Sequence, residues 1–217
     1  MRLIALDTAT GIPTVCLWLG ADEKFRWSGE LRPGPDAVLA GARGLLAQAG
    51  LDFGDLDAVA CGRGPGAFTG VRLAMALAQG LALGAGCPLI AVSELAALAW
   101  RAHRAHGWEQ VVACLDARQG EVYWSAYECG QEEPCAVVPE ALAAPRELVL
   151  PAGKWALAGS GAALFEAKPE MRVDAALAPD AEAIAALAAI KFARGETSPP
   201  GAVEPAYLRN RVAVPKA

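Results

Sequence analysis

The order of strand-like and helix-like segments limits the fold of this chain more than any other feature. Residues 2–8 form an apolar run, and residues 12–20 and 23–30 alternate between apolar and polar side chains, as β-strands do. The connections between them are short enough for hairpins. From residue 37 onward, helical periodicity alternates with short apolar runs. Three antiparallel strands followed by this alternation predict a mixed α/β sheet with helices on its faces.

The alternating part contains clear signals for where helices begin and end. Asp36 and Ser93 each precede a helical pattern, and such side chains accept hydrogen bonds from the first free N–H groups of a helix. Gly50 follows the first pattern, at a position where helices commonly end. We predict helices over 37–49, 69–84 and 94–106, and strands over 57–64 and 88–92. The first 106 residues thus have the order βββαβαβα.

A second lobe begins after the sequence HGW at 106–108. The segments EQVVACLDAR and EVYWSAYE flank Gln119-Gly120 and predict a hairpin. Further along, we predict a strand over 154–159, a short helical piece over 161–167 and a helix from Asp180 to Arg194. The chain is therefore divided into residues 1–106, the βββαβαβα lobe, and residues 107–217, a smaller α/β lobe.

Composition indicates a cytoplasmic protein that does not enter membranes. The longest apolar run, Leu73 to Leu83, is too short to cross a bilayer and is interrupted by Gln79 and Gly80. The N-terminus carries no pattern of an export signal. The six cysteines are scattered without a CxxC pair, which predicts reduced, packed thiols.

The net charge of −5 argues against a chain that binds nucleic acid by itself. Non-specific affinity for nucleic acid comes from lysine and arginine side chains that neutralise phosphates. We therefore expect contact with RNA only as part of a larger complex.

The loop GRGPGAFTGVR at 62–72 is the first candidate for chemistry. Its glycines permit backbone geometry that other residues resist, and a helix that begins near Thr69 would direct free N–H groups at an anion in front of it. The spacing matches neither a Walker A loop nor the dinucleotide-binding GxGxxG. A phosphate cradle and a purely structural turn both remain open.

The sequence LDTAT at 6–10 is the second candidate. Asp7 at the end of a strand can position Mg²⁺ or a water molecule, and the Thr8 hydroxyl can contact a phosphate. The alternative is that both side chains bond to their own hairpin. The candidate nucleotide-contacting residues are Asp7, Thr8, Gly64, Gly66 and Thr69.

No metal site and no catalytic residue is expected. His103 and His106 are the only histidines, and they lie near the end of a predicted helix. No serine or cysteine stands in a motif that would pair it with a base. A peptidase activity therefore has no nucleophile, base and orienting group to support it.

Small residues recur at helical spacing in the helices predicted over 37–49 and 69–84. Such rows allow another backbone to approach closely, and an interior glycine such as Gly80 costs up to about 1 kcal/mol relative to alanine unless a contact offsets it. Packing against the chain's own sheet and contact with a second chain are both open. We predict partner contacts at Val38, Gly41, Leu45, Gly70, Ala74, Leu77 and Ala78. A bulky charged residue at Ala74 or Ala78 is expected to block that contact and leave the monomer folded.

Several blocks of the sequence together resemble one protein family. They are LIALDTAT, GRGPGAFTGVRLAMALAQGLA, PLIAVSELAALA, LDARQGEVYW and EPAYLRNRVA, and they extend over nearly the whole chain. In these blocks the chain is similar to the bacterial TsaB (YeaZ) proteins. The glycine-rich block and the DAR-x-GEVYW block are specific in combination.

The resemblance implies an actin-like, Hsp70-type ATPase fold of the ribonuclease H-like class, with two related lobes of which the second is reduced. It also implies a role in making threonylcarbamoyladenosine at position 37 of tRNA (t6A37). In this family the chain is a non-catalytic partner of the paralogous transferase TsaD, with which it forms a heterodimer, and the ATPase TsaE joins the complex. Self-association into a homodimer and contact with tRNA only within the complex are implied as well.

Two departures support a non-catalytic role. The paralogue carries a His-x-x-x-His metal motif where this chain has Ser93 to Ala97, so no metal is expected. Active members of the fold have glycine near the first aspartate, whereas this chain has Asp7-Thr8-Ala9, whose Cβ would crowd a phosphate. We expect no tightly bound cofactor, and weak ATP or ADP binding at a subunit interface remains open. The alternative is an ATPase or kinase of the same fold that uses Asp7 and the 62–70 loop.

Overall fold

The computed structural model describes residues 1–31, 34–130, 132–166 and 171–209. A first five-stranded sheet has the order β3-β2-β1-β4-β5. β1 pairs antiparallel with β2, β2 pairs antiparallel with β3, and β4 and β5 run parallel to β1. The predicted mixed sheet is therefore confirmed. Its strands are β1 (Leu3–Asp7), β2 (Thr14–Trp18), β3 (Lys24–Ser28), β4 (Ala58–Gly62) and β5 (Leu89–Val92).

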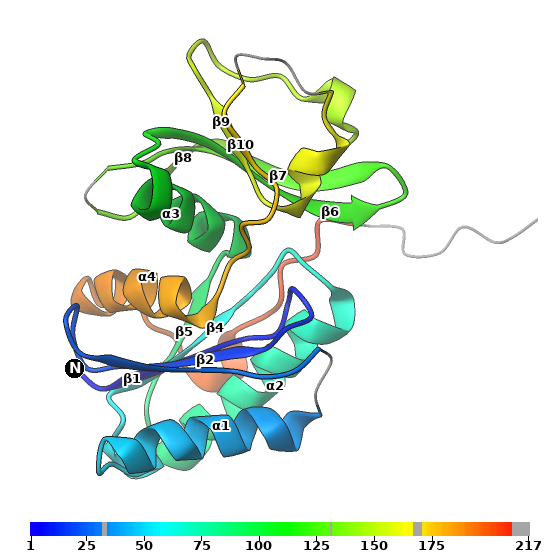
Figure 1. Cartoon of the computed structure of the whole chain (residues 1–217). Coiled ribbons are helices and arrows are strands. Elements are labelled where there is room, and N and C mark those ends of the chain that lie inside the picture. Colours follow the sequence, from blue (N-terminus) through cyan, green and yellow to red (C-terminus); the bar gives the residue numbers. More distant parts are fainter. Residues whose placement is uncertain (32–33, 131, 167–170, 210–217) are drawn as a thin grey trace, which may run out of the picture.

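Helices α1 (Pro35–Gln48) and α2 (Phe68–Ala85) cover one face of this sheet (Figure 1), close to the predicted ranges. Asp36 was predicted to cap α1, and this is wrong. Gly34 occupies the cap position and Asp36 lies in the first turn. The reason is Pro35, whose fixed φ and missing N–H suit the first helical position, so the helix begins before Asp36.

Length and composition alone would allow α2 to cross a membrane. In this fold α2 instead packs on the sheet, with one side buried against β4 and β1. Its buried residues are Val71, Ala74, Met75, Ala78 and Ala82.

A second five-stranded sheet has the order β10-β9-β6-β7-β8. The predicted hairpin is confirmed, with Arg118 and Gln119 at positive φ between its strands. β8 was not predicted because Pro139 interrupts its pattern, and proline is tolerated in a strand at a sheet edge, where β8 lies. The strands are β6 (Gln110–Arg118), β7 (Glu121–Glu128), β8 (Cys135–Ala143), β9 (Ala156–Ala158) and β10 (Val173–Asp174).

The two sheets repeat one topology. Each begins with an antiparallel three-stranded unit and continues with two strands parallel to the first, so that β6 to β10 correspond in order to β1 to β5. Where the first lobe has α1 and α2, the described residues of the second lobe form the 3₁₀ turns η2 (Pro145–Glu147) and η3 (Ser160–Leu164). Two related lobes, the second reduced, are thus visible in the topology itself.

The last helix of each lobe lies between the two sheets. α3 (Glu94–His106) contacts β6, and α4 (Ala181–Ala193) contacts β1 and β2. Figure 1 shows the resulting layers, from α1 and α2 through the first sheet, α4 and α3, to the second sheet. The predicted boundary at residues 106 and 107 falls between α3 and β6, yet α4 returns from the second segment to pack on the first sheet.

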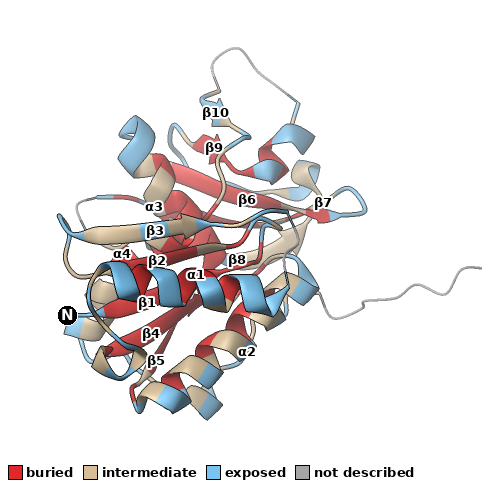
Figure 2. Ribbon diagram, turned by 60° about the horizontal axis from the view of Figure 1, so that its bottom comes forward, coloured by how far each residue is buried: buried red, intermediate tan, exposed pale blue. Residues whose placement is uncertain are grey.

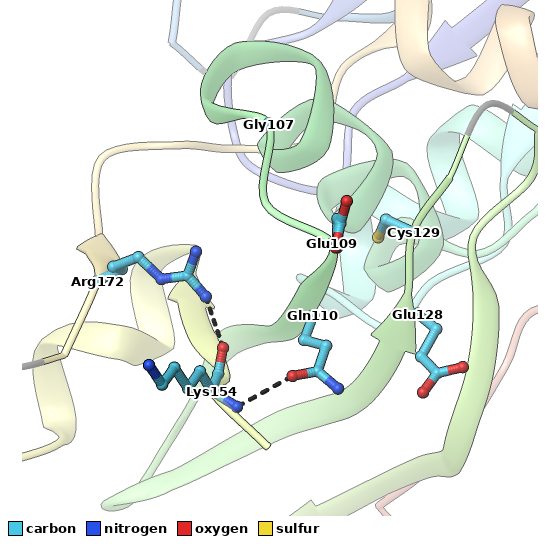
Figure 3. Close-up of a pocket in the computed structure, with 7 residues that line it drawn as sticks. All are labelled: Gly107, Glu109, Gln110, Glu128, Cys129, Lys154 and Arg172. Carbon is cyan, nitrogen blue, oxygen red and sulfur yellow. Dashed lines mark hydrogen bonds between the residues drawn. The ribbon is translucent and has the colours of Figure 1, made fainter.

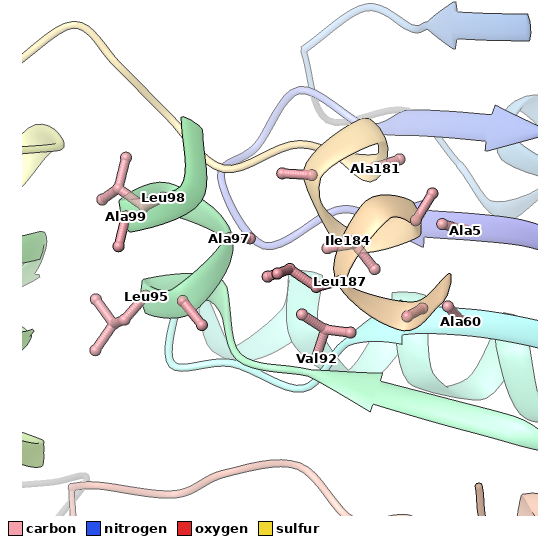
Figure 4. Packing of buried hydrophobic residues seen from close by; sticks show 14 of the residues in the cluster. Ala5, Ala60, Val92, Leu95, Ala97, Leu98, Ala99, Ala181, Ile184 and Leu187 are labelled. Carbon is pink, nitrogen blue, oxygen red and sulfur yellow. The ribbon is translucent and has the colours of Figure 1, made fainter. Parts of the chain in front are cut away.

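Strand alternation divides the core of the first lobe into two parts. Leu3 and Ala5 of β1 face α3 and α4, whereas Ile4 and Leu6 face α1 and α2. Figure 4 shows the part between the sheets, where Ile184 and Leu187 of α4 meet small residues of the strands. Burying an aliphatic side chain of this size contributes about 1.5 to 3 kcal/mol, so this cluster joins the two lobes.

Candidate functional site

The candidate loops meet at the carboxyl edge of the first sheet. β1 and β4 are parallel neighbours that end at Asp7 and Gly62, so the loops after them lie side by side. The N–H of Ala67 donates to the Ala9 carbonyl at 3.0 Å, and the Thr8 hydroxyl donates to the Gly70 carbonyl. A hydrogen bond in each direction therefore joins the loop after β1 to the loop and first turn after β4.

The glycines of the 62–70 loop allow this close approach. A Cβ at Gly70 would lie 2.1 Å from the carbonyl oxygen of Thr8, and a Cβ at Gly66 would lie 2.9 Å from Cβ of Ala9. The Thr8–Ala9 backbone is thus packed against residues 66–70, the loop and first turn of α2. A phosphate cradle needs free N–H groups at that place.

The structure brings together Asp7, Thr8, Gly64 and Gly66 of the candidate nucleotide-contacting residues. Gly64 has a φ of +94° and accepts a hydrogen bond from the N–H of Glu94 at 3.1 Å. Thr69 lies exposed in the first turn of α2.

A buried pair of acids, Asp7 and Glu94, stands at the same edge and was missed in the sequence. Both residues are fully buried. One Asp7 oxygen accepts the N–H of Ala9 at 2.7 Å, whereas the other and both Glu94 oxygens have no hydrogen-bond donor among the described residues. The sequence signal was Gly62, because a Cβ there would lie 1.6 Å from Glu94 Oε1.

Burial changes the acidity of both groups. It raises the pKa of Asp7 to about 7, against the effect of the Ala9 N–H, which stabilises the carboxylate. Burial and then the neighbouring charge of Asp7 raise the pKa of Glu94 well above its ordinary value. Two ionised carboxylates in contact without water are very unfavourable. The pair therefore holds at least one proton at neutral pH.

A polar contact next to this pair joins the two sheets. Arg63 Nη2 lies 2.9 Å from both carboxylate oxygens of Glu140 on β8, and the Ser93 hydroxyl also donates to Glu140. Ser93 accepts the N–H groups of Leu95 and Ala96, which confirms it as the N-cap of α3. These side chains line a cleft of about 400 Å³ between the lobes.

Another hollow, of about 540 Å³, lies away from the candidate loops (Figure 3). Lys154 donates its backbone N–H to Gln110, and Arg172 donates to the Lys154 carbonyl. Burial raises the pKa of Cys129, at its wall, to about 12, so this thiol stays protonated and is a poor nucleophile. The lining residues are Gly107, Glu109, Gln110, Glu128, Cys129, Lys154 and Arg172.

Both histidine rings contact polar groups of the same chain. His103 Nδ1 lies 3.0 Å from the Trp108 carbonyl, and His106 Nε2 lies 2.9 Å from Asp174. Within residues 1–31, 34–130, 132–166 and 171–209, no group of three or more metal-ligating side chains is present.

The predicted partner-contact residues require a correction. Four of them face the first sheet and are buried in this single chain: Val38, Leu45, Ala74 and Ala78. Gly41 lies under Trp27, Gly70 against Thr8, and Leu77 is half-buried. The small residues in these helices do allow close packing, but they pack on strands of the same chain rather than on a partner. A charged residue at Ala74 or Ala78 is therefore expected to destabilise the monomer rather than leave it folded as before.

The opposite rows of the same helices are exposed (Figure 2). A Cβ at Gly44, Gly80 or Gly84 would meet no atom within 4 Å. We call this surface the outer helix face. It consists of Ala40, Gly44 and Ala47 on α1 and Ala76, Gly80, Leu83 and Gly84 on α2.

An aromatic corner lies at the start of α2. The Arg72 guanidinium carbon is 3.7 Å from the ring centre of Phe68, and its Nε donates to the Tyr207 hydroxyl at 2.9 Å. Phe68 is 48% exposed and Tyr207 is 52% exposed. Two exposed aromatic rings around an arginine have the composition of protein-interface hot spots.

Comparisons with known proteins agree on one family. Residues 38–204 match the family described as "TsaD: tRNA N6-adenosine threonylcarbamoyltransferase". The chain is 36% identical to the "tRNA threonylcarbamoyladenosine biosynthesis protein TsaB" of Escherichia coli K12, over 98% of this chain and 96% of that protein. It is 34% identical to the protein of the same name from Haemophilus influenzae, over 98% and 95% of the two chains.

Solved structures lead to the same group. "YeaZ from Pseudomonas aeruginosa" is 40% identical, with a TM-score of 0.87 over 95% of this chain and 99% of that one. A second structure from that organism, titled as an uncharacterized protein with similarity to peptidase YEAZ, has a TM-score of 0.89 and 40% identity, over 96% and 99% of the two chains. Together with the repeated sheet topology, these matches confirm the predicted actin-like, two-lobed α/β fold.

The contact between the two loops predicts opposite effects for two glycines of α2. Gly70→Ala is expected to lower the free energy of unfolding by at least about 2 kcal/mol, because its Cβ collides with a backbone oxygen that cannot move alone. Gly80→Ala is the matched control and is expected to raise that free energy by about 0.5 to 1 kcal/mol, since its Cβ enters open space. Urea denaturation measures both, and equal effects of the two substitutions would contradict the contact.

Proposed function

Because the chain belongs to the TsaB (YeaZ) family, we propose that it is a non-catalytic subunit required for t6A37 modification of tRNA. It acts by forming a heterodimer with the transferase TsaD, together with the ATPase TsaE. It contacts tRNA only within that complex, works in the cytoplasm and forms a homodimer when the partner is absent. The names of the relatives that cover nearly the whole chain support the role in threonylcarbamoyladenosine biosynthesis.

The contact of Thr8 and Ala9 with the start of α2 is the observation that carries the non-catalytic part. Ala67 donates its N–H to Ala9, and Gly70 lies against Thr8, so one N–H at the helix end where a phosphate would bind is already bonded within the chain. At the start of α3, Ser93 and Ala97 offer a hydroxyl and a methyl group, and neither replaces an imidazole ligand. The side chains at the start of α3 therefore do not fit a metal site for threonylcarbamoyl transfer.

The outer helix face supports the partner role. Glycine inside a helix costs up to about 1 kcal/mol relative to alanine. Gly44, Gly80 and Gly84 carry this cost without a contact in the single chain. Leu83 is 68% exposed beside them. We propose that helices of TsaD, or of a second copy, pack closely on this face, with the aromatic corner at its rim.

Substitutions on the outer helix face test the partner role. Ala76→Arg and Gly80→Arg are each expected to reduce co-purification with TsaD at least tenfold, because a long charged side chain prevents close helix packing. The melting temperature of the isolated chain should stay within about 2 °C, since both positions are exposed.

Two matched variants complete that experiment. Ala105→Arg places the same side chain at an exposed position of α3, away from the outer helix face, and should leave co-purification unchanged. Ala78→Arg should instead destabilise the chain by more than about 3 kcal/mol, because it buries a charge against the sheet. Full retention of TsaD by Gly80→Arg would refute the proposed face.

The rival function, an ATPase or kinase that uses Asp7 and the 62–70 loop, makes a different prediction for nucleotide binding. We expect isothermal titration of the isolated chain with ATP and Mg²⁺ to show no heat of binding, because Thr8 and Ala9 pack against the loop and bond the N–H of Ala67. Binding that is lost in Asp7→Asn would establish the rival instead.

A further inference from the structure

Among the described residues, the buried acids Asp7 and Glu94 form no ion pair with a basic side chain. The Arg63 guanidinium, which lowers the pKa of Glu94, is engaged by Glu140. Asp180, which faces the pair from the start of α4, adds negative charge, although it is itself paired with Arg101 at 3.2 Å. Cys61 of β4 contributes only a protonated thiol, whose pKa is raised by burial. The pair is therefore stable only with a proton in place.

Glu94 connects this pair to the contact between the lobes. It is the first residue of α3, and its N–H donates to Gly64. The preceding residue, Ser93, caps the helix and donates to Glu140 on the second sheet. The room for the Glu94 side chain exists only because position 62 is glycine. A movement of Glu94 out of this space would displace Ser93 as well.

We propose that Asp7 and Glu94 share one bound proton that keeps the first turn of α3 seated on the first sheet, and that its loss loosens the Ser93–Glu140 contact between the two lobes. Glu94 holds the proton and donates it in a hydrogen bond to the Asp7 carboxylate. When the proton leaves to solvent, two adjacent carboxylates repel each other, and the longer Glu94 side chain moves toward water. The lobes are then joined by one polar contact fewer.

The direction of the pH effect follows from the raised pKa values. In the unfolded chain both acids ionise near their ordinary values, whereas the folded chain retains protons up to a pKa of about 7 for Asp7 and higher for Glu94. The stability gained is fully present below the unfolded values and is lost as the pH rises through the folded ones. The fold is thus expected to weaken from mildly acidic to mildly alkaline solution.

The test compares the full chain with Glu94→Gln, whose amide donates to Asp7 as the protonated acid does. For the wild type we expect the melting temperature to fall by about 3 to 5 °C per pH unit around neutrality, the effect of one proton on a chain of this size. Glu94→Gln should show a shallower decline and a higher melting temperature than the wild type at alkaline pH. Parallel curves for the two proteins would overturn the proposal.

Glu182→Gln is the matched control, since it makes the same change at an acid whose pKa is lowered rather than raised. Burial works to raise the pKa of Glu182, but hydrogen bonds from Arg26 and Lys24 lower it. Its stabilising effect is present above the unfolded pKa and is lost in acid, which is the opposite direction. The control should therefore be less stable than the wild type at neutral pH and leave the alkaline decline unchanged.

Two further measurements keep the proposal testable if Glu94→Gln does not fold. Infrared spectroscopy of the wild type in heavy water should show the C=O band of a protonated carboxyl at neutral pH, and this band should vanish as the pH rises. Hydrogen exchange, corrected for its intrinsic pH dependence, should accelerate over the same range in residues 93–96 and 138–142. A missing band at neutral pH, or exchange in these segments that does not change, would overturn the proposal.

Discussion

The close approach of the Thr8–Ala9 backbone to the loop before α2 is the contact on which the rest of the site depends. It requires small residues at Gly66 and Gly70, because a Cβ at either position would come within 3 Å of the facing chain. It fixes where α2 begins and uses the N–H of Ala67 internally. The Thr8–Ala9 backbone thus lies directly against the loop and first turn of α2, where one N–H, that of Ala67, is bonded within the chain.

The same contact explains why the two sides of α2 have different roles. Packing of α2 on β4 and β1 commits Ala74 and Ala78 to the core, so that Gly80 and Leu83 must face outward. Among the residues that the structure describes, the second lobe has the 3₁₀ turns η2 and η3 in the places of α1 and α2. Both α4 and the segment at Ser198, which bridges to Leu89 of β5, return to the first sheet.

Much of the order of strands and helices could be predicted from the sequence, because the signals for it are local. They are the alternation of side chains in strands and the residues Ser93 and Asp180, which cap α3 and α4. What could not be predicted depends on contacts distant in sequence. β8 contains Pro139 and is a strand only because it pairs at the edge of a sheet. The side of each helix that faces the sheet was misassigned, since small residues occur on both sides of α2. The pairing of Asp7 with Glu94 becomes visible only when β1, β4 and β5 lie side by side.

The amide of Ala67 gives the most direct test of the central claim that the Thr8–Ala9 backbone is bonded to the loop before α2. Hydrogen exchange of this amide, followed by nuclear magnetic resonance with and without ATP and Mg²⁺, reports whether its N–H is bonded within the protein. The account predicts slow exchange that nucleotide does not change, because the proton is held by the Ala9 carbonyl. Rapid exchange that becomes slow only when nucleotide is added would contradict it.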